Sequence, residues 1–546
     1  MDEKAQPKVR IKIMERFFNN AGPCVAEDHY IIDPLKRIDL PHIERLIAQK
    51  RYFVLHAPRQ TGKTTSLFAL MAYLNAQGRY HCLYADIEAA QALRGDVAKG
   101  MYTVVMQIAQ EAAFYLNDAR FKVWAQEAVK QVGAENALNE LLSRWVSDAK
   151  KPVVLLLDEV DTLIGDTLIA LLRQIRTGYG RRPKGFPQSI ILCGVRDVRD
   201  YRIHTSQREI ITGGSAFNIK AESLRLGNFT QDEVDALYGQ HTRETGQRFA
   251  SDIFPELWED TRGQPWLVNA LGYEMTWRDD IDRDRSISIT LERYRAARER
   301  LIQSRATHLD QLIEKLKEAR VHRVIAPLLA GEGESADAGI TVDDQEYVAD
   351  LGLIEIKPQE RIANRIYQEV IPRELIAVQQ SRIPHQTAWY VKPDHRLNML
   401  KLLTAFQQFF REQSDSWIER FDYKEAGPQL LLQAFLQRIV NGGGRISREY
   451  GLGRRRTDLF IEWPLDEQHG YLGPVQRVVI ELKILHKGLE TTLQEGLTQT
   501  ADYAQRCNAD ESHLMIFDRR ENVDWDSKIW QRDERSGNRT IQVWGA

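Results

Sequence analysis

The residues best suited to hold a phosphate group form one short stretch between an apolar run and a helix-like segment. The stretch reads Ala57-Pro58-Arg59-Gln60-Thr61-Gly62-Lys63-Thr64-Thr65. Small residues ahead of a helix let backbone N–H groups surround an anion, and the helix N-terminus directs partial positive charge at it. In this pattern Lys63 reaches the terminal phosphates and Thr64 places its hydroxyl on magnesium. Ala57 stands where glycine is usual, which restricts the turn.

Two carboxylates follow a second apolar run. Val153 to Leu157 are apolar without alternation, which is typical of a strand buried on both faces of a parallel sheet. Asp158 and Glu159 come next, at the carboxyl end where open α/β sheets bind ligands. We expect Asp158 to hold magnesium through its water shell and Glu159 to orient or deprotonate the attacking water. A surface turn can also begin with Asp-Glu, but the buried strand favours the functional interpretation.

Two further residues are weaker candidates for contact with a nucleotide. Arg196 ends the strand-like run that starts at Ser189; it either senses the terminal phosphate or is a salt-bridged structural arginine, and the sequence leaves both open. Pro265 lies in Thr261-Arg262-Gly263-Gln264-Pro265-Trp266, where glycine ends one helix and proline starts the next. That loop either presents Pro265 to the nucleotide or is a helical corner.

A second group with metal chemistry lies near the C-terminus. Asp458 opens one strand-like run, and Glu481 and Lys483 lie on one face of the next, because strand side chains alternate with period two. Two carboxylates that converge across neighbouring strands can hold magnesium, and a lysine beside them can activate water and stabilise charge on a phosphate. A cross-strand ion pair is the default interpretation of Glu-x-Lys. The arginine-rich stretch Arg454–Arg456 just upstream favours a functional site.

The elements that must position the first group alternate between strand-like and helix-like runs over residues 1–221. After the phosphate loop come a helix, a strand at His81–Asp86 and helical stretches at about 97–117 and 120–148. From about residue 222 helices take over, and Thr230-Gln231-Asp232-Glu233 is a capping-box signature. This order predicts a parallel α/β sheet followed by a helical lid.

Over about residues 30–300 the chain resembles the prokaryotic P-loop ATPases of the AAA/STAND group. The motifs that carry the resemblance are APRQTGKTT, VVLLLDEVD, IILCGVRD and TRGQP. The resemblance implies ATP and magnesium as cofactors, and it implies that Pro265 contacts the nucleotide as part of a Gly-x-Pro in the lid. Sites of this class often need an arginine from a neighbouring subunit, so we expect a homo-oligomer.

Residues 305–382 read as a winged-helix-like module. A helix pair precedes an apparent hairpin, in which Leu353–Ile356 pairs with Arg361–Ala363. Every charged residue from Glu332 to Ile356 is acidic, and a recognition helix of that composition would repel phosphate. We therefore expect a packing or coupling module and no binding of DNA by this segment.

After a linker expected at 383–395, about residues 395–520 resemble the PD-(D/E)XK nuclease superfamily. Thr457-Asp458 stands in place of Pro-Asp, and Glu481-x-Lys483 matches the second half of the motif. The resemblance implies a restriction-endonuclease-like α/β domain that cuts DNA with magnesium held by the two carboxylates.

Three other residues match that superfamily. Glu425 matches its acidic residue near the first helix. Gln499 and Tyr503, four residues apart and so on one helical face, match the Q-x-x-x-Y element of some of its nucleases. The resemblance implies that all three belong to the catalytic site.

Composition and charge restrict the remaining possibilities. The 546 residues carry a net charge of −3, so any nucleic-acid site must come from local patches. The four cysteines are far apart in sequence, which indicates neither a zinc site nor a disulfide framework and favours the cytoplasm. No apolar run is long enough to span a membrane, and we expect no membrane partner.

We therefore predict a multidomain α/β protein: P-loop ATPase core (1–221), helical lid (222–304), winged-helix-like module (305–382), linker (383–395) and nuclease-like domain (396–546). The predicted function is an ATP-controlled, magnesium-dependent DNA nuclease, of a kind that resemblance links to prokaryotic defence or mobile elements. One alternative is an ATP-dependent regulatory switch whose nuclease-like domain only binds nucleic acid or a partner. Another is a DNA-binding regulator that acts through the winged helix, which the acidic helix disfavours.

Overall fold

The computed structural model describes most of the chain from Glu15 onwards. The described ranges are 15–93, 96–163, 165–195, 202–204, 210–212, 218–304, 314–330, 340–357, 360–380, 389–418, 427–440, 444–449, 457–466, 473–485, 488–520 and 523–546. The chain divides into two compact units, Met1–Leu301 with Asp350–Gly352, and Ile302–Ala349 with Leu353–Ala546.

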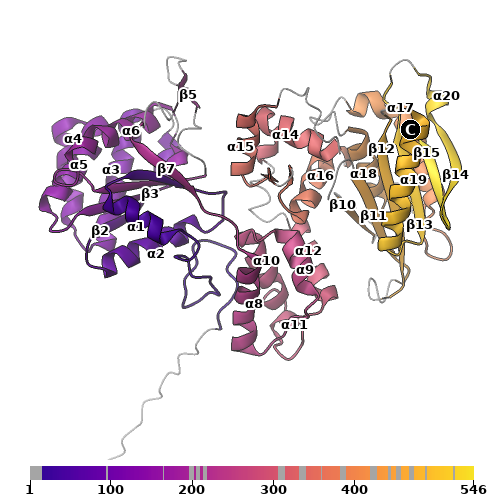
Figure 1. Cartoon of the computed structure of the whole chain (residues 1–546), viewed down its shortest axis with the longest axis horizontal. Helices are drawn as coiled ribbons and strands as arrows, with labels where there is room; N and C mark the ends of the chain where they lie inside the picture. Colours follow the sequence, from indigo (N-terminus) through magenta and orange to yellow (C-terminus); the bar gives the residue numbers. More distant parts are fainter. Residues whose placement is uncertain are drawn as a thin grey trace, which may run out of the picture. The chain divides into compact units, whose positions relative to one another are not determined.

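A parallel five-stranded sheet forms the centre of the first unit (Figure 1), with strand order β2-β3-β4-β1-β7. Its strands are β1 (Tyr52–His56), β2 (His81–Asp86), β3 (Val153–Asp158), β4 (Ser189–Gly194) and β7 (Lys220–Arg225). Every residue of β1, β3 and β4 is buried, which explains why most of their residues are apolar.

Helices cover both faces of this sheet, as Figure 1 shows. They are α1 (Leu40–Ala48) and α2 (Lys63–Ala76) on one face, and α3 (Val97–Tyr115), α4 (Arg120–Val132), α5 (Ala134–Asp148) and α6 (Gly165–Gly178) on the other. Alternate side chains of β3 pack into the two hydrophobic cores, one on each face of the sheet. Leu156 packs with α1 and α2, whereas Leu155 and Leu157 pack with α3 to α6. The sheet is therefore held from both sides, and its strand ends are fixed in place.

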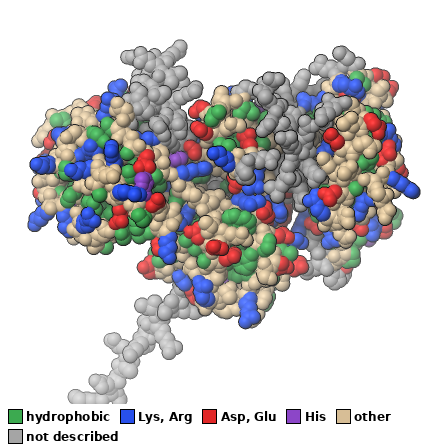
Figure 2. Space-filling view, viewed as in Figure 1, with side chains coloured by type: hydrophobic (Ala, Val, Ile, Leu, Met, Phe, Trp, Pro, Cys, Tyr) green, Lys and Arg blue, Asp and Glu red, His purple; other side chains and the backbone are tan. Residues whose placement is uncertain are grey.

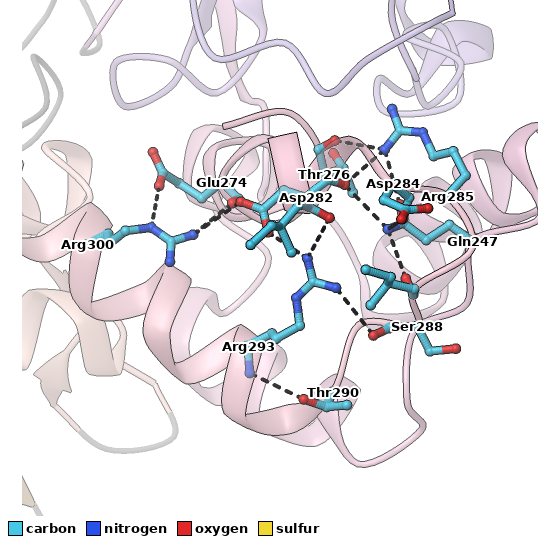
Figure 3. Close-up of polar contacts among 12 residues, drawn as sticks. Gln247, Glu274, Thr276, Asp282, Asp284, Arg285, Ser288, Thr290, Arg293 and Arg300 are labelled. Atoms are coloured by element: carbon cyan, nitrogen blue, oxygen red, sulfur yellow. Dashed lines mark hydrogen bonds and ion pairs between the residues drawn. The ribbon is translucent and has the colours of Figure 1, made fainter. Parts of the chain in front are cut away.

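The lid of the first unit is helical. It consists of α8 (Gln231–Thr245), α9 (Ile253–Thr261), α10 (Pro265–Thr276), α11 (Asp280–Arg283) and α12 (Leu291–Gln303). The predicted capping box is present, with the Thr230 hydroxyl accepting from Glu233 N–H and the Glu233 carboxylate accepting from Thr230 N–H. A polar network ties the short α11 to its neighbours (Figure 3), in which Arg293 pairs with Asp282 at 2.7 Å.

The second unit begins with the helix–hairpin module. Its elements are α14 (Ala319–Ala330), α15 (Val342–Asp350), β8 (Ile354–Glu355), β9 (Arg361–Ile362) and α16 (Arg365–Gln380). The predicted hairpin is present, with Ile354 opposite Ile362. The acidic α15 is partly neutralised by α14, because Arg320 and Arg323 both pair with the buried Asp344 carboxylate, at 3.1 and 2.9 Å. The net negative charge at α15, on which the expectation of no DNA binding depends, is therefore smaller than the sequence of α15 alone indicates.

A mixed six-stranded sheet, ordered β10-β11-β12-β13-β15-β14, forms the rest of the second unit. Its strands are β10 (Arg445–Glu449), β11 (Thr457–Pro464), β12 (Val475–Ile484), β13 (Glu511–Phe517), β14 (Trp530–Ser536) and β15 (Arg539–Gly545). Helix α19 (Leu489–Arg506) lies on one face, where Leu493 and Leu497 pack on Leu514. Helix α17 (Met399–Ile418) contacts the other face through Phe410 and Phe517.

Four further elements and the 3-10 turns complete the described part of the chain. They are the two-stranded β5 (Arg202–His204) and β6 (Ile210–Thr212), the helices α18 (Gly427–Val440) and α20 (Trp525–Lys528), and short 3-10 turns. None of the described helices combines the length and the apolar character that crossing a membrane requires.

Candidate functional site

The backbone of the phosphate loop requires glycine at position 62 but not at position 57. Gly62 has φ +91°, in the left-handed region that favours glycine, and a Cβ there would lie 2.7 Å from Arg37 Nη1. Ala57 is fully buried in the core, and its N–H donates to the Gly194 carbonyl at 3.2 Å. Position 57 therefore continues the line of β1, and alanine at this position does not restrict the turn.

Lys63 is folded back over the loop that precedes it. It begins α2 and is 6% exposed, and its ammonium donates to the carbonyls of Ala57 at 3.0 Å and Pro58 at 3.1 Å. No carboxylate among the described residues pairs with this charge. A buried cation whose hydrogen bonds go to carbonyls can turn to an anion that enters the loop.

The two predicted magnesium residues of the first unit lie in direct contact. Thr64 Oγ1 donates to Asp158 Oδ2 at 2.8 Å, and the Tyr84 hydroxyl donates to the same oxygen at 3.1 Å. The other oxygen of Asp158 accepts from the Glu159 N–H at 3.0 Å, and Asp158 is fully buried. A carboxylate and a hydroxyl side by side are oxygen ligands of the kind that magnesium takes, so these residues fit the predicted ion.

Glu159 has the backbone and the pKa of a residue placed for proton transfer. Its φ is +58°, an uncommon value for a residue other than glycine and one found at functional sites. The pKa of its carboxyl is raised to about 7, mainly by burial and further by the Asp161 carboxylate, while the Lys63 ammonium opposes both effects. A carboxyl with a pKa near the operating pH is well matched to general-base chemistry.

Residues of the segment before β1 make hydrogen bonds to the phosphate loop and to the start of α2, and no sequence motif indicates these bonds. Arg37 donates to the Thr61 carbonyl at 2.7 Å and to the Gly227 carbonyl at 2.8 Å. The Thr65 hydroxyl accepts from the Cys24 N–H at 3.1 Å. Since Arg37 lies 24 residues ahead of Thr61 and in no recognised motif, only the tertiary structure reveals it.

The lid loop reaches the phosphate loop through a short chain of contacts. Pro265 is buried at the first position of α10, after the positive-φ Gly263. A Cβ on Gly263 would lie 2.0 Å from the Phe229 carbonyl oxygen. Arg37 lies over the Phe229 ring, 4.6 Å from its centroid. These contacts connect the lid loop to the phosphate loop through Phe229 and Arg37. The other weak candidate, Arg196, lies outside the described residues.

In the second unit the backbone register sets the two predicted metal-binding residues opposite each other. Asp458 of β11 is directly opposite Glu481 of the antiparallel β12, so the two residues share one face of the sheet. Glu481 is fully buried, and its Oε1 lies 2.7 Å from the Lys483 ammonium. Neither oxygen of Glu481 has a hydrogen-bond partner with favourable geometry among the described residues. The side chain of Asp458 lies outside the described part of the chain.

Helix α19 places its two predicted residues over the same face. Tyr503 packs against Val479, which lies two residues before Glu481 on β12. The Oε1 atom of Gln499, one turn earlier, is buried without a hydrogen-bond partner among the described residues. Glu425 and Arg454–Arg456 fall outside the described ranges. Within those ranges no group of three or more His, Cys, Asp or Glu side chains could hold a metal.

Comparisons with known proteins give distant structural likenesses. No family model and no curated protein matches the sequence. Solved structures similar to this chain include the Walker-type ATPase of Pyrococcus abyssi (14% identity, TM-score 0.42, 64% of this chain and 98% of that one). Two others are Cdc6p from Pyrobaculum aerophilum (15%, 0.35, 75% and 93%) and the RuvB Holliday junction branch migration motor of Thermotoga maritima (12%, 0.30, 61% and 94%).

At these TM-scores the likenesses carry no argument, and they give no support to the nuclease resemblance. What the chain itself has is a multidomain α/β fold with a parallel five-stranded, P-loop-like sheet, a helical lid and a C-terminal mixed sheet.

Proposed function

We propose that the first unit binds and hydrolyses ATP with magnesium. The observation that carries this is the contact between Thr64 and Asp158 at 2.8 Å, which joins the phosphate loop to the end of β3. The buried Lys63 cation lies in the same loop. Hydroxyl, carboxylate and ammonium are thus gathered where the phosphates of a nucleotide would enter.

Each residue then has a separate task. The loop N–H groups and Lys63 bind the β- and γ-phosphates, and Thr64 and Asp158 hold the metal and its water shell. Magnesium, when bound, neutralises charge that develops on the phosphates. Glu159 accepts the proton of the water that attacks the γ-phosphate, because its raised pKa leaves it basic enough at neutral pH.

The experiment is a comparison of ATP binding and turnover in two variants. Glu159→Gln should bind ATP as wild type does and hydrolyse it at least about tenfold more slowly, the size of a general-base effect. Asp232→Asn, an acidic residue on the lid helix α8, is the matched control and should keep wild-type turnover. Wild-type turnover in Glu159→Gln would assign the base to another residue.

We also propose that copies of this chain assemble around the nucleotide. The support is the resemblance, since sites of this class often take an arginine from a neighbouring subunit. Light scattering with and without ATP and magnesium tests it, and a molecular mass equal to that of one chain under every nucleotide condition would contradict it.

For the second unit we propose magnesium-dependent hydrolysis of DNA, controlled by the ATPase. One specific observation favours this over a plain ion pair. Glu481 is fully buried and its Oε1 pairs with the Lys483 ammonium at 2.7 Å, whereas its Oε2 has no hydrogen-bond partner among the described residues. A buried carboxylate left in that state is costly, and a metal ion shared with Asp458 would satisfy it.

The proposed chemistry divides between three residues. Asp458 and Glu481, opposite each other in the sheet, hold the ion, which activates water when bound. Lys483, with its ammonium 2.7 Å from Glu481, orients that water and stabilises negative charge on the phosphodiester in the transition state. Gln499 and Tyr503 on α19 border the same face and would position the DNA backbone.

A cleavage assay separates this proposal from the regulatory alternative. Plasmid and single-stranded DNA are incubated with the full chain, with and without ATP, and with magnesium or manganese. Glu481→Gln and Lys483→Ala should both lose cleavage. Glu534→Gln is the control, because Glu534 also pairs with a basic residue in the same sheet, Arg532 at 2.9 Å, and it should keep wild-type cleavage.

A thermal-unfolding arm gives a readout besides activity. Magnesium without nucleotide should raise the Tm of wild type more than that of Glu481→Gln, because a ligand stabilises only a protein that binds it. Wild type that neither cuts DNA nor gains stability through Glu481 would favour the alternative, an ATP switch whose second unit only binds nucleic acid or a partner.

A further inference from the structure

The edge of the first sheet that lies opposite the proposed ATP site is lined by basic residues. Strands β1, β2, β3 and β4 are parallel neighbours, so the loops that precede them all lie along one edge. Each of these loops contains lysine or arginine. The seven that are exposed, here called the basic edge, are Lys50, Arg51, Arg79, Lys150, Lys151, Arg181 and Lys184.

Contacts between the loops show that they lie side by side. The Ser189 hydroxyl at the start of β4 donates to the Arg51 carbonyl at 2.6 Å, and His81 N–H at the start of β2 donates to the Pro152 carbonyl at 3.0 Å. The Lys151 ammonium lies 3.8 Å from where a Cβ on Gly78 would be, next to Arg79. The loops that carry these cations are therefore neighbours along one edge of the sheet.

The charge of the basic edge is not neutralised from within the structure. No carboxylate among the described residues forms an ion pair with any of its seven members. Two acidic residues of the helices that lead into these loops, Asp148 of α5 and Glu44 of α1, have other partners. Asp148 pairs with Arg120 at 2.9 Å, and Glu44 accepts hydrogen bonds from Tyr73 at 3.0 Å and Gln77 at 2.8 Å. In a protein of net charge −3, such a surface is a local feature that a partner can use.

The dimensions of the basic edge match a nucleic-acid backbone. Neighbouring strands are about 4.8 Å apart, so four of them span about 14 Å. That length of duplex DNA carries about eight phosphate charges, at one per about 1.7 Å of axis. Lys and Arg side chains gather in several groups over the visible face of the first unit (Figure 2).

We propose that the basic edge binds the sugar-phosphate backbone of nucleic acid without reading its sequence. An anionic membrane is the less favoured partner, because binding at a lipid surface also uses exposed apolar side chains. The large hydrophobic side chains exposed among the described residues include none from the four loops. The proposal does not depend on the second unit being a nuclease, since it concerns binding by the ATPase core.

The test measures how the affinity for DNA depends on salt. Full-length protein is titrated into a fluorescent 20-base-pair duplex of arbitrary sequence, in EDTA and without nucleotide, between about 50 and 200 mM salt. EDTA removes cleavage from the experiment, so that failure of the nuclease proposal would not affect the result. The variant is Lys150→Ala/Lys151→Ala, and the matched control is Lys122→Ala/Lys130→Ala, two exposed lysines on α4.

The first double variant should bind DNA more weakly, and its plot of log affinity against log salt should be shallower by up to about 1.8, since each phosphate contact contributes about 0.9. The control should keep the wild-type slope, and both variants should keep wild-type ATP turnover and Tm. A wild-type slope in the first variant, or an equal loss in both, would overturn the proposal. So would binding of the protein to phosphatidylserine vesicles combined with no binding to duplex or single-stranded DNA.

Discussion

Lowering the pH from 8 to 6 should reduce ATP hydrolysis about tenfold while leaving ATP bound. The carboxyl of Glu159 has a pKa raised to about 7 by burial, with Asp161 adding to the rise. Only the ionised carboxylate can accept a proton, and its fraction falls from about 90% at pH 8 to about 10% at pH 6 for a group with this pKa. Activity is therefore present above the raised pKa and lost as the pH falls through it.

The assay is kcat for ATP hydrolysis at saturating ATP and magnesium, measured between pH 5.5 and 8.5. Asp161→Asn removes a negative charge that raises the Glu159 pKa, so its profile should move to lower pH. Asp232→Asn on α8 should leave the profile in place. A kcat that stays flat down to pH 5.5 in wild type would refute the assignment of Glu159 as the base, and an unmoved profile in Asp161→Asn would refute the electrostatic explanation.

Two other predictions concern the same unit. Lys63→Ala should abolish tight ATP binding measured by calorimetry, because it removes the buried cation of the phosphate loop, whereas Lys122→Ala on α4 should bind normally. Gly263→Ala should lower the free energy of unfolding by at least about 1 kcal/mol more than Gly246→Ala. Both glycines have positive φ, but of the two only Gly263 would place a Cβ against a backbone carbonyl, that of Phe229. Urea unfolding measures the two free energies. An equal loss of stability in both variants would contradict the expected clash with Phe229.

The phosphate loop and the β3 carboxylates were predictable because local sequence determines them. A glycine in a left-handed turn before a helix and a continuously apolar strand each leave a signature within ten residues. Parallel strands end at the same edge of a sheet, so the sequence already placed Thr64 near Asp158. The structure has them in contact at 2.8 Å.

The contacts that complete this site were not predictable, because they join residues distant in sequence. Tyr84 donates to Asp158 from 74 positions away, and Arg37 bridges two backbone segments with no motif of its own. The acidic helix α15 is a similar case. Its charge indicated repulsion of DNA, but the arginines that pair with Asp344 lie on another helix, where a reading of one segment at a time misses them.

In the second unit the shared face of Glu481 and Lys483 was predictable, whereas the register and the order of the strands were not. Alternation placed Glu481 and Lys483 on one face, and the β11–β12 pairing set Asp458 opposite Glu481. The sequence did not reveal that β13 and β15 extend the sheet in parallel while β14 closes it in the antiparallel sense. Strand order depends on long-range pairing, and local patterns do not encode it.

The measurement that tests the central claim most directly is a structure of the chain with magnesium and a non-hydrolysable ATP analogue. The account predicts that the Lys63 ammonium leaves the carbonyls of Ala57 and Pro58, which it now contacts at 3.0 and 3.1 Å, and binds the terminal phosphates. It also predicts magnesium about 2.1 Å from Thr64 Oγ1, with Asp158 bonded to the metal's waters. A nucleotide bound elsewhere, or a Lys63 that still contacts the two carbonyls with nucleotide in place, would contradict the proposed ATP site.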